Sequence, residues 1–334
     1  MKHAPHAPRW LLSAGALLCA CGATPAAPAD ASADAPAGDA APADGSVATG
    51  AVSGTFQVQL VAASGTAPGY TNVVGRVQLG ETPETTAWAE ALADGDCKLL
   101  TPRIPFCATP CGGSAACVAD NTCVPYPTSQ GAGTVRMTGL RTTDGVMPIE
   151  LTLVANNYQP PGSVTLPFPA FAEGDALRLE ASGAGAVPAF AVDGRGIAPL
   201  TVTSTMLQVA MNTPVELRWT APGAAGAGSR VKVKLDISHH GGTRGMVSCD
   251  TTDDGSLTIG APLVTRLVGL GVAGFPSIVV TRENVGTAAV GTGRVSMVVS
   301  STVENYVTVP GVRSCTDTAD CMGMGTCRAD LTCG

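Results

Sequence analysis

Twelve cysteines are the residues of this sequence whose type and spacing point most directly to chemistry. Four lie six residues apart at the end of the sequence, and four others form a second cluster inside it. Both clusters end in the pattern Cys-x-Ala-Asp-x-Thr-Cys, and they comprise Cys315, Cys321, Cys327 and Cys333, and Cys107, Cys111, Cys117 and Cys123. Cysteines spaced in this way either pair as disulfides or bind zinc.

The spacing favours disulfides. Zinc sites commonly use a Cys-x2-Cys pair or added histidines, and neither cluster contains such a pair. Three pairings are open to the last four cysteines, and of these we expect the interleaved one, Cys315–Cys327 with Cys321–Cys333. The expected partner of Cys97 is Cys249, a bond that would join two β-rich regions. We expect the terminal module to be a stabilising cap, with a protruding recognition site as the alternative.

Metal and cofactor sites are not predicted. His239 and His240 follow a strand-like segment, where adjacent side chains point to opposite faces, so we expect a turn with one packed ring and one solvated ring. Asp250–Gly255 resembles the start of a calcium-binding EF-hand loop, but Thr252 and Ala261 stand at two ligand positions. We therefore expect an Asp-Gly turn between two strands.

Catalytic patterns are also absent from the sequence. It contains no Gly-x-Ser-x-Gly, no His-Glu-x-x-His, no phosphate-binding glycine loop and no dinucleotide fingerprint. The one catalytic alternative is a hydrolase, or an accessory domain of one, that uses the His239–His240 region beside Asp236 and a serine. Enzyme activity is therefore not the main expectation.

The first fifty residues predict export and a tether. Residues 1–21 combine a basic start, a short apolar run and the sequence Leu18-Cys19-Ala20-Cys21, which resembles a bacterial lipobox with Cys21 as the acylated residue. Cleavage by an ordinary signal peptidase and free secretion is the alternative. Residues 22–50 are rich in Ala, Pro and Asp and lack Lys and Arg, so we expect a disordered tether.

The remaining sequence predicts an all-β fold. Gly (41) and Pro (25) are abundant and aromatic residues are only 4%, a balance typical of short strands and many turns. Alternating segments predict strands within 51–198, which carries the Cys-rich insertion 97–123, and within 199–312, ahead of a disulfide-rich module at 313–334. One-faced alternation, clearest in Val231–Ser238, predicts antiparallel sheets that stack as two immunoglobulin-like β-sandwich domains.

The expected strands include 56–60, 73–79, 134–140, 147–155, 164–166, 176–181, 215–219, 277–281, 295–301 and 306–309. One short helix is expected to begin near Pro262, to bury Leu263, Val264, Leu267 and Val268, and to end at Gly269 or Gly271.

The lipobox, the acidic tether, the β-sandwich regions and the Cys-x5-Cys modules together resemble uncharacterised surface lipoproteins of myxobacteria and related Gram-negative bacteria. The resemblance implies an exported protein in the outer membrane, at the cell surface or on the periplasmic face, held by its lipid anchor. It brings no catalytic or binding residues. The formal net charge of −7, without a basic patch, argues against a nucleic-acid partner. We expect a non-enzymatic binding, adhesion or structural role, with an envelope protein or a glycan as partner.

Overall fold

The computed structural model describes residues 50–145 and 147–334. Its strands are β1 Val52–Val61, β2 Tyr70–Leu79, β3 Ala87–Asp94, β4 Cys97–Arg103, β5 Ala115–Ala119, β6 Thr122–Pro125, β7 Thr128–Gln130, β8 Val135–Thr138, β9 Ile149–Val154, β10 Asn157–Gln159, β11 Ala176–Ala181, β12 Phe190–Arg195, β13 Val215–Arg218, β14 Arg230–Asp236, β15 Met246–Thr252, β16 Ser256–Ile259, β17 Ser277–Val290 and β18 Gly293–Tyr306. The helices are α1 Ala261–Gly269 and the single 3-10 turns Ala224–Gly226 and Thr318–Cys321. The all-β class is confirmed.

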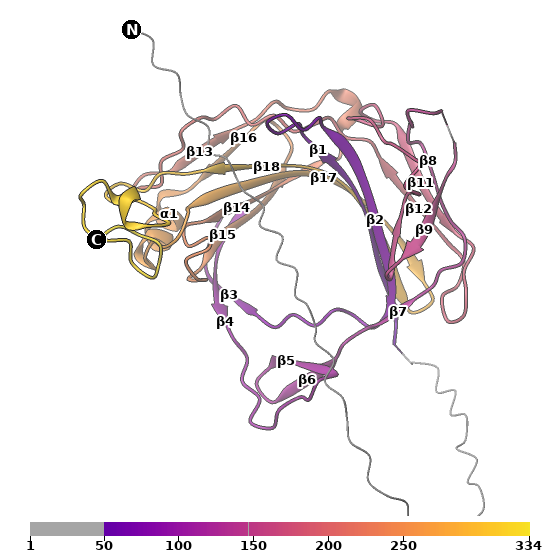
Figure 1. The fold of residues 1–334 in the computed structure, drawn as a ribbon, viewed down its shortest axis with the longest axis horizontal. Coiled ribbons are helices and arrows are strands. Elements are labelled where there is room, and N and C mark those ends of the chain that lie inside the picture. The colour runs from indigo at the N-terminus through magenta and orange to yellow at the C-terminus, as the bar shows by residue number, and fades with distance from the viewer. Residues whose placement is uncertain (1–49, 146) are drawn as a thin grey trace, which may run out of the picture. The chain divides into compact units, whose positions relative to one another are not determined.

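One sheet of fourteen strands organises the described residues (Figure 1). Its order is β12-β11-β8-β9-β10-β2-β1-β18-β17-β14-β15-β4-β3, and β7 pairs with the end of β2 on the same edge as β10. β1 and β18 are parallel, every other pair of named strands in the described residues is antiparallel, and one isolated bridge, Gln208–Thr308, is parallel. The short pairs β13–β16 and β5–β6 form two separate ribbons.

Both hydrophobic cores lie on the same face of this sheet. Phe56 of β1 is paired with Met297 of β18, and both belong to the first core. Val303, six residues further along β18, is paired with Val280 of β17, which is paired in turn with Val233 of β14 in the second core. Because cross-strand partners share a face and side chains alternate along a strand, the residues between these positions point to the opposite face, away from both cores.

The first core has β1, β2 and the halves of β17 and β18 nearest the turn between them on one side. Strands β8 to β12 cover its other side. β12 returns to lie against β17, where the Arg195 backbone N–H donates to Asn284 Oδ1 at 3.0 Å. A Cβ at Gly286 would lie 1.8 Å from the Asp193 carbonyl oxygen, so only glycine permits this approach.

The second core has β4, β14, β15 and the first half of β17 on one side. On its other side are the pair β13–β16 and helix α1. The helix begins after Gly260 with Pro262 in its first turn, and it buries Leu263, Val264 and Leu267 as expected, whereas Val268 is only partly buried. The Cys97–Cys249 disulfide joins β4 to β15 inside this core, which confirms the expected pairing.

A buried ion pair lies where segments of the two regions meet. Arg282 of β17 and Asp253 are 1% and 2% exposed, and Arg282 Nε donates to Asp253 Oδ2 at 2.6 Å. The guanidinium also donates to the carbonyl oxygens of Ala198, Pro199 and Thr220. One side chain therefore ties together the connecting segment before residue 200, the end of β13 and the turn after β15.

Most expected strands are present. Ala176–Ala181 is confirmed at both ends, while β17 and β18 are each fourteen residues long and exceed the expected segments. Two expectations were wrong: residues 164–166 form no strand, and β18 ends at Tyr306, followed by one isolated bridge at Thr308. Leu166, Val307 and Val309 of these segments are buried as loop side chains in the two cores.

The two cores draw on residues from both sides of position 198. β3 and β4 come from the first expected region, yet β4 pairs with β15 and contributes Leu99 to the second core. β17 and β18 come from the second expected region, yet Val290 and Val295 belong to the first core. All of these elements fall in one compact unit, Ser46–Gly334.

Replacement of Gly75 by alanine tests the packing of the first core. A Cβ at this position would lie 2.0 Å from the ring of Phe56, which is fully buried and contacts Tyr158 and Phe190. We expect Gly75→Ala to lower the free energy of unfolding by about 2–3 kcal/mol, because an overpacked core must shift. Gly162→Ala is the matched control, since nothing lies within 4 Å of its added Cβ. Equal urea midpoints for the two variants would contradict this account.

Candidate functional site

The face of the sheet opposite the cores carries mostly polar residues, interrupted by one row in which Val74, Val298 and Val285 lie beside Gln57. Asn72, Gln59, Ser300, Glu283 and Arg230 form one row of paired residues across β2, β1, β18, β17 and β14. Parallel rows on this face add Ser53, Thr55, Gln57, Arg76, Thr281, Arg294, Ser296, Thr302, Lys232 and Lys234. We call this surface the polar face.

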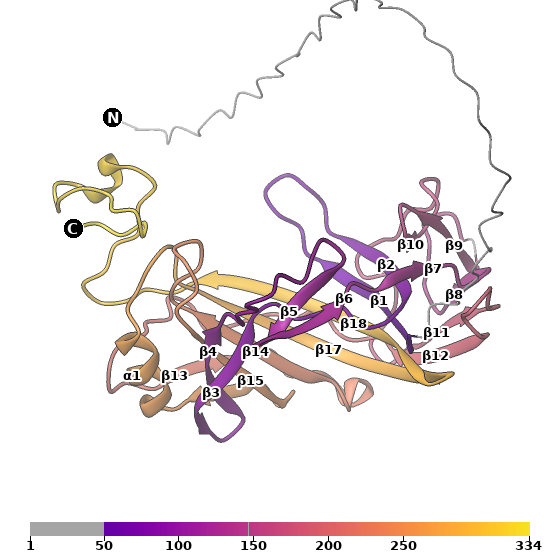
Figure 2. The same ribbon diagram turned by 90° about the horizontal axis from the view of Figure 1, so that it is seen from below.

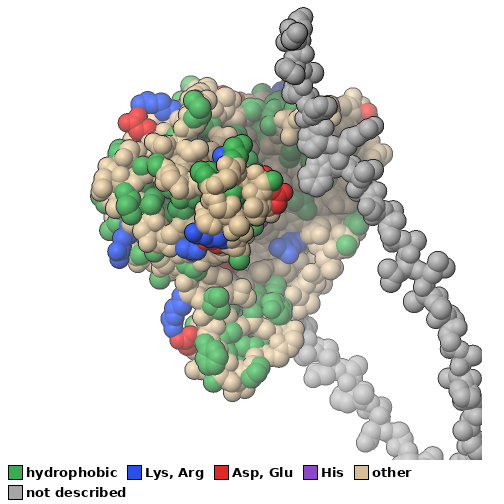
Figure 3. All heavy atoms as spheres, turned by 60° about the vertical axis from the view of Figure 1, so that its left-hand side comes forward, with side chains coloured by type: hydrophobic (Ala, Val, Ile, Leu, Met, Phe, Trp, Pro, Cys, Tyr) green, Lys and Arg blue, Asp and Glu red, His purple; other side chains and the backbone are tan. Residues whose placement is uncertain are grey.

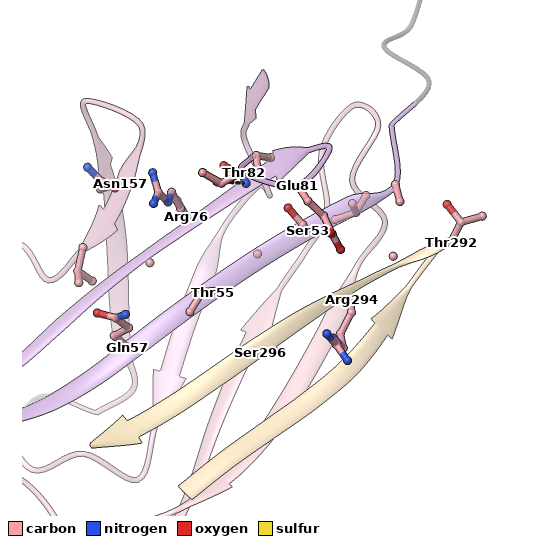
Figure 4. Close-up of a pocket in the computed structure, with 17 residues that line it drawn as sticks. Ser53, Thr55, Gln57, Arg76, Glu81, Thr82, Asn157, Thr292, Arg294 and Ser296 are labelled. Atoms are coloured by element: carbon pink, nitrogen blue, oxygen red, sulfur yellow. Dashed lines mark hydrogen bonds between the residues drawn. The ribbon is translucent and has the colours of Figure 1, made fainter. Parts of the chain in front are cut away.

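A groove of about 740 Å³ lies at one end of the polar face, between β2, β1 and the turn of the β17–β18 hairpin (Figure 4). Its floor is formed by alternate residues of β1, namely Ser53, Thr55 and Gln57, whose neighbours Val52, Phe56 and Val58 are buried in the first core. The groove lining contains no aromatic side chain. A second hollow of about 490 Å³ continues along the same strands and is lined by Gln59–Ser64 and Ser300, Thr302–Glu304.

Two arginines flank the groove floor. Arg76 of β2 is paired with Thr55 on one side of β1, and Arg294 of β18 is paired with Ser53 on the other side. Both are exposed, and neither forms an ion pair with any residue of 50–145 or 147–334. Elsewhere on the polar face cations are neutralised, as Lys232 is by Glu283 at 2.6 Å. Figure 4 shows the two guanidinium groups on opposite sides of β1.

Side-chain amides make a short chain of hydrogen bonds beside the groove. Asn72 Nδ2 donates to Gln59 Oε1 at 3.2 Å, and Gln59 Nε2 donates to Gln57 Oε1 at 3.0 Å. The hydroxyls of Thr281 and Thr302 are 3.0 Å apart further along the face. The hydrogen bonds between the amides fix which end of each side chain donates and which end accepts.

The Cys-rich segment 104–127, which we call the strap, crosses this side of the sheet. It leaves β4, the neighbour of the edge strand β3, and reaches β7, which pairs with β2 in the middle of the sheet. Figures 1 and 2 both place β5 and β6 over the polar side, and Figure 3 shows the surface hollowed next to the strap. The strap exposes three large apolar side chains, Ile104, Phe106 and Tyr126.

Disulfides hold the strap in place of a core. Cys107 pairs with Cys117 and Cys111 with Cys123, so the two bonds interleave. The module at the end of the sequence has the expected interleaved pairs Cys315–Cys327 and Cys321–Cys333. Three sulfur atoms in each cluster lie close enough together to suggest a metal site, but each of these atoms is already bonded to another cysteine.

The two modules share a backbone turn as well as a sequence pattern. Asn121 and Leu331 occupy the same position of the pattern, and both have a left-handed conformation with φ of 57° and 61°. The preceding aspartates contact arginines outside the modules: Asp120 contacts Arg103 at the end of β4, and Asp330 lies 3.7 Å from Arg244. Hydrogen bonds from Thr332 hold the pKa of the Asp330 carboxyl below its ordinary value.

The histidines lie in a turn rather than in a cleft. His240 is exposed with φ of 63°, and the two rings contact each other with centroids 3.9 Å apart. Neither ring lines the groove, and in the described ranges neither forms a hydrogen bond or an ion pair with a serine or a carboxylate. Asp236 instead accepts hydrogen bonds from the backbone N–H and the hydroxyl of Ser238. The arrangement expected for a hydrolase is therefore not formed.

Asp250–Gly255 forms the expected turn, with Gly255 at φ 102° between β15 and β16. Sequence reasoning missed Asp253, whose carboxylate accepts hydrogen bonds from Trp219 Nε1 and Ser229 Oγ as well as from Arg282. Burial raises the pKa of Asp253, but these hydrogen bonds and the charge of Arg282 outweigh burial and hold the pKa below its ordinary value. The strand alternation Ile278, Val280, Arg282 was the available signal, since it places Arg282 on the core face.

The expected leader, the acylated Cys21 and the tether lie outside the described residues. Among the residues that the structure does describe, no helix has the length and apolar character needed to cross a membrane.

Comparisons with known proteins give no family. No protein-family model matches the chain, and no curated protein matches it. Among solved structures, the FN1–FN3 domains of chicken CNTN1 are similar at a TM-score of 0.18 and 7% identity, over 70% of this chain and 79% of that one. At that TM-score the similarity carries no argument about fold or function.

Proposed function

We propose that this protein is a lipid-anchored lipoprotein of the cell envelope that binds a partner through the polar face, without catalysis. The observation that carries the proposal is the placement of both cores on one side of a single sheet. This placement leaves the other side, from β2 to β14, outside both cores and lined mostly by amides, hydroxyls and charged groups, some exposed and some half-buried beneath the strap side.

The strap supports the same function. Loops held on a rigid sheet commonly carry binding residues, and this strap is cross-linked twice and carries exposed apolar side chains. The five disulfides fit an oxidising compartment outside the cytoplasm. The lipobox-like sequence ending at Cys21 supplies the anchor in this proposal.

Site-specific photo-cross-linking in cells tests the proposal. A photoreactive residue at Thr55, exposed on the polar face, should form an adduct with an envelope component. The matched control is Glu180, which is exposed on β11, four strands from β2 in the sheet order and outside the strands β2 to β14, and it should form none. Equal adducts at both positions, or none at Thr55, would exclude the polar face as the binding surface.

The anchor is tested separately. Cys21→Ser should release the protein from the membrane fraction, because the acylated thiol is lost, while the fold and the disulfides stay unchanged. Fractionation followed by non-reducing electrophoresis measures both properties. Retention of the Cys21→Ser variant in the membrane fraction would exclude this anchor.

A further inference from the structure

We propose that the groove between Arg76 and Arg294 binds an acidic polysaccharide, a sugar chain with carboxylate, sulfate or phosphate groups. This inference rests on the proposed function and names the ligand class of the same face. It depends on charge complementarity, on the chemistry of the groove lining and on the length of the surface.

The charges of the groove point to an anionic ligand. The chain as a whole is acidic, with a formal charge of −7, so its net charge does not by itself attract polyanions. Arg76 and Arg294 are exposed guanidinium groups without an ion-pair partner in the described residues, and both line one groove. Guanidinium groups form paired, charge-assisted hydrogen bonds with carboxylate, sulfate and phosphate.

The separation of the two arginines favours a chain over a single small ion. Their backbones lie on the two strands flanking β1, at positions two residues apart along it. The spacings of a β-sheet place the two Cα atoms about 12 Å apart. The guanidinium groups lie on opposite sides of β1, so an isolated phosphate contacts one of them while a polymer with repeated anions contacts both (Figure 4).

The lining between the arginines suits sugar hydroxyls. Ser53, Thr55, Gln57 and Ser296 offer hydroxyl and amide groups that both donate and accept hydrogen bonds. The groove has no aromatic platform on which nucleic-acid bases would stack. The carboxylate of Glu81 also lines it, and this charge disfavours polyanions as dense as DNA while it can accept hydrogen bonds from sugar hydroxyls.

The shape of the surface agrees with an extended ligand. The floor is the face of a sheet rather than its edge, so an added peptide strand finds no open backbone groups there. The same face continues from Gln57 past Gln59 to the second hollow, lined by Ser300 and Thr302. A chain several sugars long can therefore lie along β1 and β18.

Binding of defined polysaccharides to the purified full-length lipoprotein in detergent tests the inference. The probes are polygalacturonate, and dextran sulfate matched in length to unmodified dextran, and the readout is biolayer interferometry. We expect both acidic polymers to bind and the unmodified dextran to bind at least about tenfold more weakly. Arg76→Gln/Arg294→Gln should weaken the acidic polymers about tenfold and flatten the dependence on salt.

Two further variants control for charge. Arg195→Gln/Arg266→Gln removes two exposed arginines outside the groove and should leave binding unchanged. Glu81→Gln should strengthen the binding of both acidic polymers, because it removes a repelling charge from the groove. Disulfide content and thermal unfolding confirm that each variant is folded.

Several results would overturn the inference: no binding of either acidic polymer, equal binding of unmodified dextran, an unchanged affinity of the groove variant, or tighter binding of oligothymidylate than of polygalacturonate. The proposed function is tested independently of the ligand class. If Thr55 forms an adduct with an envelope protein while the polysaccharides do not bind, the polar face remains the binding surface and only the ligand class is wrong.

Discussion

Asp253→Asn should lower the free energy of unfolding by about 3–5 kcal/mol, because it leaves the Arg282 charge buried without its counter-charge. The side chain of Arg282 is only 1% exposed, and its partner carboxylate receives hydrogen bonds from three side chains. Breaking one side of such a pair costs more than the pair itself contributes, since the remaining ion stays desolvated.

Urea unfolding at neutral pH measures this effect. The matched control is Asp250→Asn, three residues away, whose carboxylate binds Arg230 at 2.6 Å with both side chains about half exposed. That variant should lose only about 0–1 kcal/mol, because solvent screens the pair. A similar loss in the two variants would show that burial of the Arg282–Asp253 pair has no special weight.

The same pair predicts a pH dependence. The pKa of Asp253 is lowered in the folded state, so its stabilisation is fully present above the ordinary aspartate pKa of about 3.9 and is lost as the pH falls toward the lower folded value. The difference in stability between wild type and Asp253→Asn should therefore shrink below about pH 4. A difference that stays constant down to pH 2 would contradict the assignment.

Removal of the Cys97–Cys249 bond by a double alanine substitution should lower the free energy of unfolding by about 4–5 kcal/mol. The bond closes a loop with a sequence separation of 152, so it removes much conformational entropy from the unfolded chain. It also fixes β4 against β15 inside the second core, next to Leu99 and Val247.

The strap bond Cys111–Cys123 serves as the comparison. Its sequence separation is 12 and its segment touches neither core, so Cys111→Ala/Cys123→Ala should leave the main unfolding midpoint nearly unchanged. The loss should appear locally, as faster proteolysis within 104–127. A larger fall of the main midpoint in this variant than in Cys97→Ala/Cys249→Ala would contradict the account.

Strand positions and cysteine pairing were largely predictable from local patterns. The alternation of Val231, Val233 and Leu235 with lysines predicted β14 and its buried face, and the equal spacing of the last four cysteines led to the observed pairing. The Asp-Gly turn and helix α1 were predictable for the same reason, because turn and capping preferences act over a few residues.

The site was not predictable, because it depends on pairing between distant segments. Arg76 and Arg294 are separated by most of the folded sequence, and only the parallel alignment of β1 with β18 brings them to the same groove. From the sequence alone Asp253 is an ordinary aspartate in a turn, because its contact with Arg282 depends on tertiary structure. The polar face likewise needs strand order, which alternation within one strand does not give.

The neighbouring positions of β1 and β18 also constrain the order of folding. The first strand of the folded part pairs with the last, and each hydrophobic cluster contains residues from β17, β18 or the segment directly after them. A chain made N-terminus first therefore has neither core complete until the residues of β18 have been added. Because these pairings join residues far apart in the sequence, loop closure must precede them and folding is expected to be slow. Until Cys249 is present, Cys97 also lacks the partner with which it is bonded in the folded protein.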